Sequence, residues 1–155
     1  MADKPDFDLG AAHRYFSAHC FNQAWELIEK PNRTPSEDEQ MIQLSLASIW
    51  HWAQRPDCTP TNLSVGYWQT ARIYALLGQA ENARRCAQMC LEASQQPGVE
   101  PFYLAYAYEA LARAEITAGE KGRAYGYLTE ARRLAMEIKD ESSRAALLAD
   151  LETVR

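Results

Sequence analysis

The sequence predicts an all-α protein built from stacked helical hairpins. Two segments match each other at a spacing of 41 residues, the distance from Gly78 to Gly119 (119 − 78). Shifted by this distance, the coinciding pairs are Tyr67 with Tyr108, Ala71 with Ala112, Arg72 with Arg113, and Ala83 with Ala124. Aromatic residue, small residue, glycine turn and small residue is the order expected where antiparallel helices pack closely and stack. β-Branched residues are sparse, and no segment alternates apolar and polar residues over a strand length.

Proline, glycine and capping residues divide the chain into about eight helices. The predicted helices span about 9–18, 22–29, 35–54, 63–77, 80–95, 101–118, 120–138 and 140–153. The segments 63–95 and 101–138 form the two matching hairpins. Residues 9–54 form degenerate N-terminal helices, and 140–153 is a capping helix. At 155 residues, the chain has the size of a single domain, 1–155.

The first three helices have local signals of their own. Tyr15 and Phe16 lie on an apolar side of the first, and Trp25 is apolar in the second. In the third, Thr34 caps the start and Glu37 completes a capping box, while Pro35 suits the first helical position. Two prolines in the following connector forbid a continuous helix there.

Glycine turns and a cap define the later helices. Gly78 turns the fourth helix into the fifth, and Gly119 gives the sixth a left-handed C-cap. Asp140 is the N-cap of the last helix. The apolar residues of that helix are expected to cover the end of the stack, and they are Ala145, Leu148 and Leu151.

Residues 63–138 resemble two tetratricopeptide repeats (TPRs). The motif residues are Tyr67, Ala71, Tyr74, Gly78, Ala83 and Cys90 in the first copy, and Tyr108, Ala112, Gly119, Ala124 and Ala131 in the second. Glu115 replaces the second aromatic of copy two, the motif's final proline is missing, and the period exceeds the usual ~34 residues. The resemblance implies a right-handed α-α superhelix of about three hairpins plus a capping helix, as in small stand-alone bacterial TPR-like proteins. The motif residues are structural and imply no activity.

Composition and charge restrict the partners. The net charge of −5 argues against non-specific nucleic-acid binding, which needs a basic face. The N-terminus lacks the apolar stretch of a signal peptide, and no run approaches the ~18 apolar residues of a membrane span. We therefore expect a cytoplasmic protein with neither a nucleic-acid nor a membrane partner.

The cysteines predict no metal centre. Cys86 and Cys90 are one helical turn apart, but a metal site would need a second pair or nearby histidines. The histidines are distant in sequence, at positions 13, 19 and 51. We expect buried thiols, no metal and no cofactor.

Two matched arginines are the main functional signal. The resemblance implies that the first helix of each hairpin lines a concave groove. The face next to the packing residues carries Trp68 and Arg72 in one copy and Glu109 and Arg113 in the other, with Tyr106 nearby. A guanidinium suits a carboxylate or phosphate, and an aromatic ring suits an apolar contact. Two interpretations stay open: the arginines bind a ligand, or they pair with acids of the scaffold such as Glu109.

A second signal is the run of large rings Trp50, His51 and Trp52. Successive helical residues point about 100° apart, so at least one ring faces a groove, a partner or a neighbouring helix. His51 is a candidate ligand contact or general base, although a histidine in such a position more often forms a hydrogen bond between helices, which is the interpretation we favour. His19 beside Cys20 has no third orienting group, which argues against a nucleophile–base pair.

The predicted function is a binding module that holds a peptide or partner protein in the groove, with an arginine-lined anionic subsite. The alternative is a small-molecule-binding protein or enzyme with an enclosed pocket, formed by His51, Trp68, Arg72, Glu109 and Arg113. In that case the partner is an anionic small molecule, and His51 and Glu109 are the candidate catalytic residues. Because no recognisable catalytic motif occurs, an enzyme is not the default. Aromatic residues at the N-terminal end would also allow a homodimer.

Overall fold

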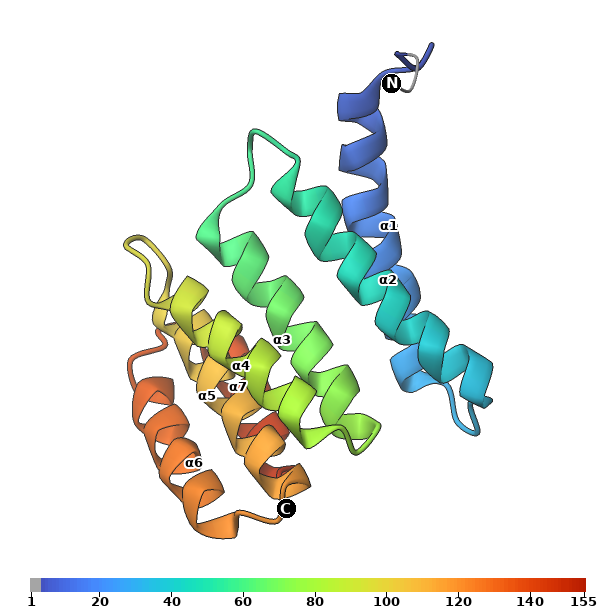
Figure 1. Ribbon diagram of the computed structural model, residues 1–155. Coiled ribbons are helices and arrows are strands. Elements are labelled where there is room, and N and C mark those ends of the chain that lie inside the picture. Colours follow the sequence, from blue (N-terminus) through green and yellow to red (C-terminus); the bar gives the residue numbers. More distant parts are fainter. Residues whose placement is uncertain (1–3) are drawn as a thin grey trace. The chain divides into compact units, whose positions relative to one another are not determined.

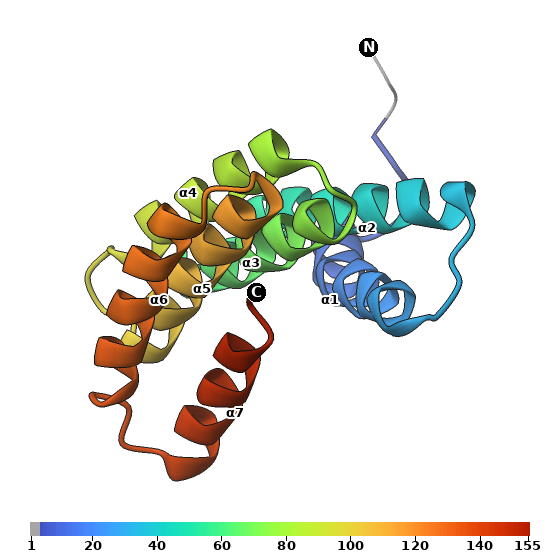
Figure 2. The ribbon, with the colours of Figure 1, turned by 90° about the horizontal axis from the view of Figure 1, so that it is seen from below.

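The computed structural model describes residues 4–155, and all regular secondary structure in this part of the chain is α-helical (Figure 1, with a second view in Figure 2). Seven helices make up 76% of these described residues. Their bounds are α1 (Leu9–Glu29), α2 (Pro35–Ala53), α3 (Pro60–Leu76), α4 (Ala80–Ser94), α5 (Pro101–Thr117), α6 (Lys121–Ala135) and α7 (Glu141–Glu152). The predicted all-α class is confirmed.

Contacts between helices divide the chain into two compact units. The first ends at Thr59 and contains α1 and α2, whereas the second, Pro60–Arg155, contains α3 to α7. The boundary lies in the connector where prolines were expected to interrupt the helices. The first unit buries Cys20, Ala24, Met41, Ile42 and Ile49. The core of the second includes Leu128, Leu134, Ile138, Leu147, Leu151 and Val154.

The prediction of two separate helices at 9–18 and 22–29 is wrong, because helix α1 covers both ranges. A single helix of 21 residues runs through both ranges. The expected break at 19–21 contains neither proline nor glycine, so nothing local interrupts the backbone hydrogen bonds. The buried residues of α1 have spacings of three and four, which places them on one continuous face: Ser17, Cys20 and Ala24.

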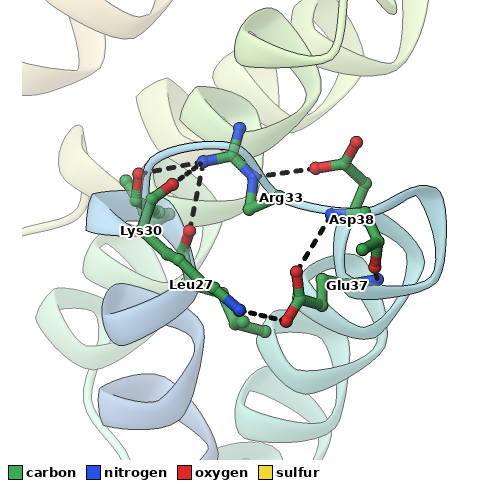
Figure 3. Close-up of polar contacts among 7 residues, drawn as sticks. Leu27, Lys30, Arg33, Glu37 and Asp38 are labelled. Carbon is green, nitrogen blue, oxygen red and sulfur yellow. Dashed lines mark hydrogen bonds and ion pairs between the residues drawn. The ribbon is translucent and has the colours of Figure 1, made fainter.

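Arg33 closes the turn between α1 and α2 (Figure 3). Its Nη1 donates to the carbonyl oxygens of Leu27, Ile28 and Lys30 at 3.1, 3.2 and 3.1 Å. Its Nε donates to Asp38 Oδ1 at 2.7 Å. The last carbonyls of a helix have no partner within the helix, so the guanidinium satisfies them and complements the negative helix end.

The predicted start of α2 is confirmed. The backbone N–H of Glu37 donates to Thr34 Oγ1 at 3.2 Å, and the Thr34 N–H donates to Glu37 Oε2 at 2.9 Å. Lys30 also pairs with the Glu37 carboxylate. These contacts lower the pKa of Glu37, with the Lys30 hydrogen bond as the largest cause. The capping box therefore fixes the first turn of α2, and the Lys30–Glu37 pair connects that turn to the end of α1.

Helix α5 is the centre of the second unit. It contacts α3, α4, α6 and α7. Figure 1 and Figure 2 together show α4 and α6 on one side of α5 and α7 on the other. The small side chains of α5 let its neighbours approach closely. Its buried alanines are Ala105, Ala107, Ala110, Ala112 and Ala114.

The two glycine turns have the predicted left-handed backbone. Gly78 has φ 74° and Gly119 has φ 80°. After each glycine, a backbone N–H reaches back to the preceding helix at 2.8 Å, from Gln79 to Tyr74 O and from Glu120 to Glu115 O. Both turns thus satisfy helix-terminal carbonyls in the manner of a Schellman motif. Helices α3 and α5 have 17 residues each, and α4 and α6 have 15 each.

The last helix is capped as predicted but buries a different face. Asp140 Oδ2 accepts a hydrogen bond from the Ser143 N–H at 2.7 Å. Leu151 is buried as expected, but Ala145 and Leu148 are exposed, and Leu147 is buried instead. Adjacent helical positions differ by about 100°, so packing of α7 on α5 and α6 selects Leu147 over Leu148.

Replacing Gly119 with alanine is expected to lower the free energy of unfolding by about 1 kcal/mol, because an alanine strains the left-handed backbone. Gly126 is the matched control, since it lies inside α6 and an added Cβ would meet no atom within 4 Å. Gly126→Ala is expected to raise the free energy of unfolding by about 0.5–1 kcal/mol. Urea denaturation measures both, and a change of the same sign at both positions would contradict this account.

Candidate functional site

An aromatic pocket lies between α3 and α5 in the second unit. Its volume is about 300 Å³, and its lining residues are Ser64, Val65, Trp68, Phe102, Tyr103 and Tyr106. On each helix these residues lie at spacings of one, three and four positions, which places them on one face. The Tyr106 ring contacts the rings of Trp68 and Phe102 edge-on, with centroids 5.3 and 5.0 Å away. These contacts fix the orientation of the pocket walls.

A buried carboxylate lies beside the pocket. Glu109 of α5 has no exposed surface. Trp68 Nε1 donates to its Oε2 at 2.9 Å, and Arg113 Nε donates to its Oε1. Arg72 Nη1 lies 3.8 Å from the same Oε1. Two cations and an indole N–H therefore offset the cost of burying the charge.

The same network extends to α7. Tyr106 donates its hydroxyl proton to Asp150 Oδ2 at 2.7 Å. Arg113 Nη2 donates to the Asp150 carbonyl oxygen at 3.2 Å and to Thr153 Oγ1 at 2.6 Å. Burial, and then the hydrogen bond to Asp150, raise the pKa of Tyr106, so its hydroxyl stays a donor at neutral pH. Helices α3, α5 and α7 are thus linked through side chains around the pocket.

The structure brings together most of the side chains that the sequence singled out. Trp68, Arg72, Tyr106, Glu109 and Arg113 form one connected group in the second unit. The arginines pair with Glu109, which is the scaffold interpretation that the sequence left open. Their role in binding a ligand stays a prediction.

Sequence reasoning missed several residues of the site. Phe102 and Tyr103 line the pocket from α5, and Asp150 and Thr153 hold the network from α7. The cluster of aromatic residues at 102, 103 and 106, at helical spacing, was a readable signal. The contacts of α7 had no such signal, because they depend on how that helix packs.

His51 belongs to the first unit, whereas the group around Glu109 belongs to the second. Its Nδ1 is 2.8 Å from His13 Nδ1, so α1 and α2 are joined by a hydrogen bond between imidazoles. This contact is the inter-helix hydrogen bond that the sequence offered as one possibility. Burial, and then the nearby His13, lower the pKa of His51. Both effects favour the neutral imidazole.

A second buried carboxylate explains a departure from the repeat pattern. Glu115 occupies the position that matches Tyr74, and it is 4% exposed. Arg84 of α4 donates to both of its carboxylate oxygens, from Nε at 3.0 Å and from Nη2 at 2.7 Å. At this position of α5, an ion pair to α4 therefore occurs where the matching position of α3 has the tyrosine Tyr74.

The thiols are free, as the sequence predicts. Cys20, Cys86 and Cys90 are buried as predicted, whereas the prediction of a buried thiol is wrong for Cys58, which is half-buried in the connector between α2 and α3. Burial raises the pKa of the Cys90 thiol to about 12, against the weaker effect of hydrogen bonds from Ser64 and Ser94. Such a thiol is unreactive at neutral pH. Within residues 4–155, no group of three or more His, Cys, Asp or Glu side chains is arranged to hold a metal ion.

Comparison with known proteins assigns no family. No protein-family model and no curated protein matches the chain. Among the described residues, no helix is both long enough and apolar enough to cross a membrane.

Arg113 is expected to be the more important structural partner of Glu109. Arg113→Leu leaves the buried carboxylate with the more distant Arg72, and should lower the free energy of unfolding by about 3 kcal/mol. Arg133→Leu is the matched control, because the ion pairs of Arg133 with Glu130 and Glu137 are largely exposed to solvent and their loss should change little. Denaturant unfolding of both variants measures the difference, and equal losses would contradict a structural role for Arg113.

Proposed function

We propose that the chain is a TPR-like binding module whose second unit holds a peptide segment of a partner protein on α3 and α5. Several observations support the TPR-like build. Matching helices start 41 residues apart, from Pro60 to Pro101 (101 − 60) and from Ala80 to Lys121 (121 − 80). Their lengths agree, and both hairpins turn at a left-handed glycine. In this proposal α1 and α2 are a degenerate third hairpin, and α7 is the capping helix of a right-handed superhelix.

The aromatic pocket is the observation that carries the proposed activity. Its walls are apolar rings, and hydrogen bonds to Glu109 and Asp150 hold Trp68 and Tyr106 in place before any ligand arrives. A preformed pocket loses little conformational entropy on binding. Its volume of about 300 Å³ suits one large side chain of a peptide. The ligand is therefore a segment with an aromatic or large aliphatic anchor residue.

The position of Arg72 indicates that the peptide has a negatively charged group next to that anchor residue. Its side chain is 24% exposed, and its guanidinium lies over the Trp68 ring, 5.9 Å from the centroid. Its Nη1 lies 3.8 Å from Glu109 Oε1, to which Arg113 donates a hydrogen bond. We assign Arg72 to the anionic subsite because this partly exposed guanidinium lies beside a ring of the pocket wall. An acidic side chain or a C-terminal carboxylate of the peptide suits this position.

A small-molecule site is the second candidate, and the pocket volume favours it. About 300 Å³ is the lower end of the range of small-molecule pockets. The catalytic version of this candidate has less support. The carboxylate of Glu109 already accepts bonds from Trp68 and Arg113, and His51 bonds to His13, so proton transfer by either residue would break an existing contact.

Filling the pocket should abolish peptide binding. Val65→Trp adds an indole to the pocket wall, while Leu76→Trp adds the same group at a half-exposed position of the same helix. Peptides selected by the wild-type chain from a random library displayed on phage should bind Leu76→Trp and lose binding to Val65→Trp. Fluorescence anisotropy measures the affinities, and circular dichroism checks that both variants stay helical.

The selected peptides also test the charged subsite. We expect enrichment of an aromatic or large aliphatic residue next to an acidic group, and loss of the acidic preference with Arg72→Gln. Equal binding by Val65→Trp and wild type, or no enriched peptide at all, would contradict the proposed function. A pocket that binds small-molecule fragments but no peptide would favour the second candidate.

A further inference from the structure

The first unit carries a cluster of aromatic rings that runs across α1 and α2. Each ring contacts the next, and the centroids of neighbouring rings lie 5.0–5.4 Å apart. We call this surface the ring face, and it consists of His13, Tyr15, Phe16, His19, Trp50 and His51. All three histidines of the chain belong to it.

The large rings of the ring face are open to solvent. The exposed fractions are 58% for Tyr15, 41% for Phe16 and 57% for Trp50. With about 200 Å² for each aromatic side chain, these three rings leave roughly 300 Å² of mostly apolar surface in water. Leu46 lies one helical turn before Trp50 and is also exposed, so the apolar surface continues along α2. A contiguous apolar patch of this size is typical of a binding surface.

The ring face and the helices beside it have almost no charge. No charged residue occurs within 15–25 of α1 or within 40–54 of α2 and its C-cap. A partner recognised by opposite charge would therefore find no charged group in these stretches. Two copies of a chain with a net charge of −5 repel each other, and the ring face is a surface where they can meet without bringing like charges together.

The imidazole pair makes the ring face complementary to a copy of itself. His13 Nδ1 and His51 Nδ1 lie 2.8 Å apart, so one neutral imidazole donates and the other accepts. The donor then has a lone pair at its Nε2, and the acceptor has an N–H at its own Nε2. The pair therefore carries one further donor and one further acceptor. In a twofold arrangement, the donor of one copy meets the acceptor of the other, and the reverse.

We propose that the ring face is the interface of a symmetric homodimer, in which each copy covers the exposed rings of the other. A twofold interface uses the same surface on both copies, so apolar rings pack against apolar rings. The rings supply roughly 300 Å² of the about 800 Å² that each partner buries in a standard interface. The uncharged stretches of α1 and α2 around them form the rim.

Protonation of the imidazoles weakens this dimer. One proton on the pair turns the free Nε2 acceptor into a donor and places a positive charge on the same face of both copies. The other titratable groups along α1 and α2 near the imidazoles are Asp8, Arg14, Tyr15, His19, Cys20, Arg55 and Asp57. Arg14 lies 3.9 Å from Asp8, and Arg55 donates to Asp57, so neither acid is left to neutralise an imidazolium. Dimer affinity therefore falls as the pH falls through the pKa of the imidazoles.

Sedimentation velocity on the full chain tests the proposal. Wild type should be dimeric at about 0.1 mM and pH about 7.5, and its dissociation constant should rise at least about 10-fold at pH about 5.5. Trp50→Lys and Leu46→Lys should each raise the dissociation constant at least about 100-fold, because a twofold interface receives both added charges. Tyr125→Lys is the matched control and should leave it unchanged, since Tyr125 is an exposed aromatic residue on α6 of the other unit.

Circular dichroism checks that each variant stays helical. Leu46→Lys keeps the test decisive if Trp50→Lys fails to fold, because Leu46 belongs to none of the ring contacts. A wild-type chain that stays monomeric at about 1 mM would overturn the proposal. So would folded Trp50→Lys and Leu46→Lys variants that dimerise like wild type, or loss of the dimer in Tyr125→Lys. An unchanged dissociation constant at the lower pH would overturn the role of the imidazoles. The result is independent of peptide binding, since the peptide pocket lies in the second unit.

Discussion

The buried charge of Glu109 is the constraint on which the second unit depends. Glu109 has no exposed surface, and burying an unpaired carboxylate charge lowers the stability of the fold by roughly several kcal/mol. Donors from α3 and α5 meet this cost, and one of them, Arg113, also bonds to Thr153 after α7. The group that neutralises the charge therefore joins three helices. It also fixes Trp68, so the pocket wall is a consequence of the same pairing.

Ion pairs set the alignment of α5 with its neighbouring helices, which its alanines alone do not determine. Alanine side chains are alike in size, so an alanine-rich face packs closely at more than one register. Glu109 pairs toward α3, and Glu115 pairs toward α4 through both oxygens of its carboxylate. Each pair is satisfied at a single offset between the helices, and any slip would leave a buried charge unpaired. Small residues thus set the distance between the helices, and charged residues set their alignment.

Local signals account for the parts of the fold that the sequence predicts well. The capping box at Thr34, the left-handed glycine turns and the cap at Asp140 all appear as expected, because each involves only a few neighbouring residues. The errors have a different origin. A break was expected at 19–21, but this segment contains no helix-breaking residue and α1 continues through it. Leu148 was expected to be buried, but Leu147 is buried instead. Which face a helix buries depends on its neighbours, so the sequence of one helix does not decide it.

By itself, the sequence determined the helical class, the glycine turns and only part of the candidate site, such as Trp68, Tyr106 and Glu109. It did so because caps, turns and helical periodicity are local properties of the chain. Only the tertiary structure decided what Arg72 and Arg113 contact, since a guanidinium suits a ligand and a buried carboxylate equally well. The same is true of the pocket between α3 and α5 and of the bond between His13 and His51. Each requires two segments that are far apart in the sequence to meet. Their separation along the chain does not predict how close they lie in space.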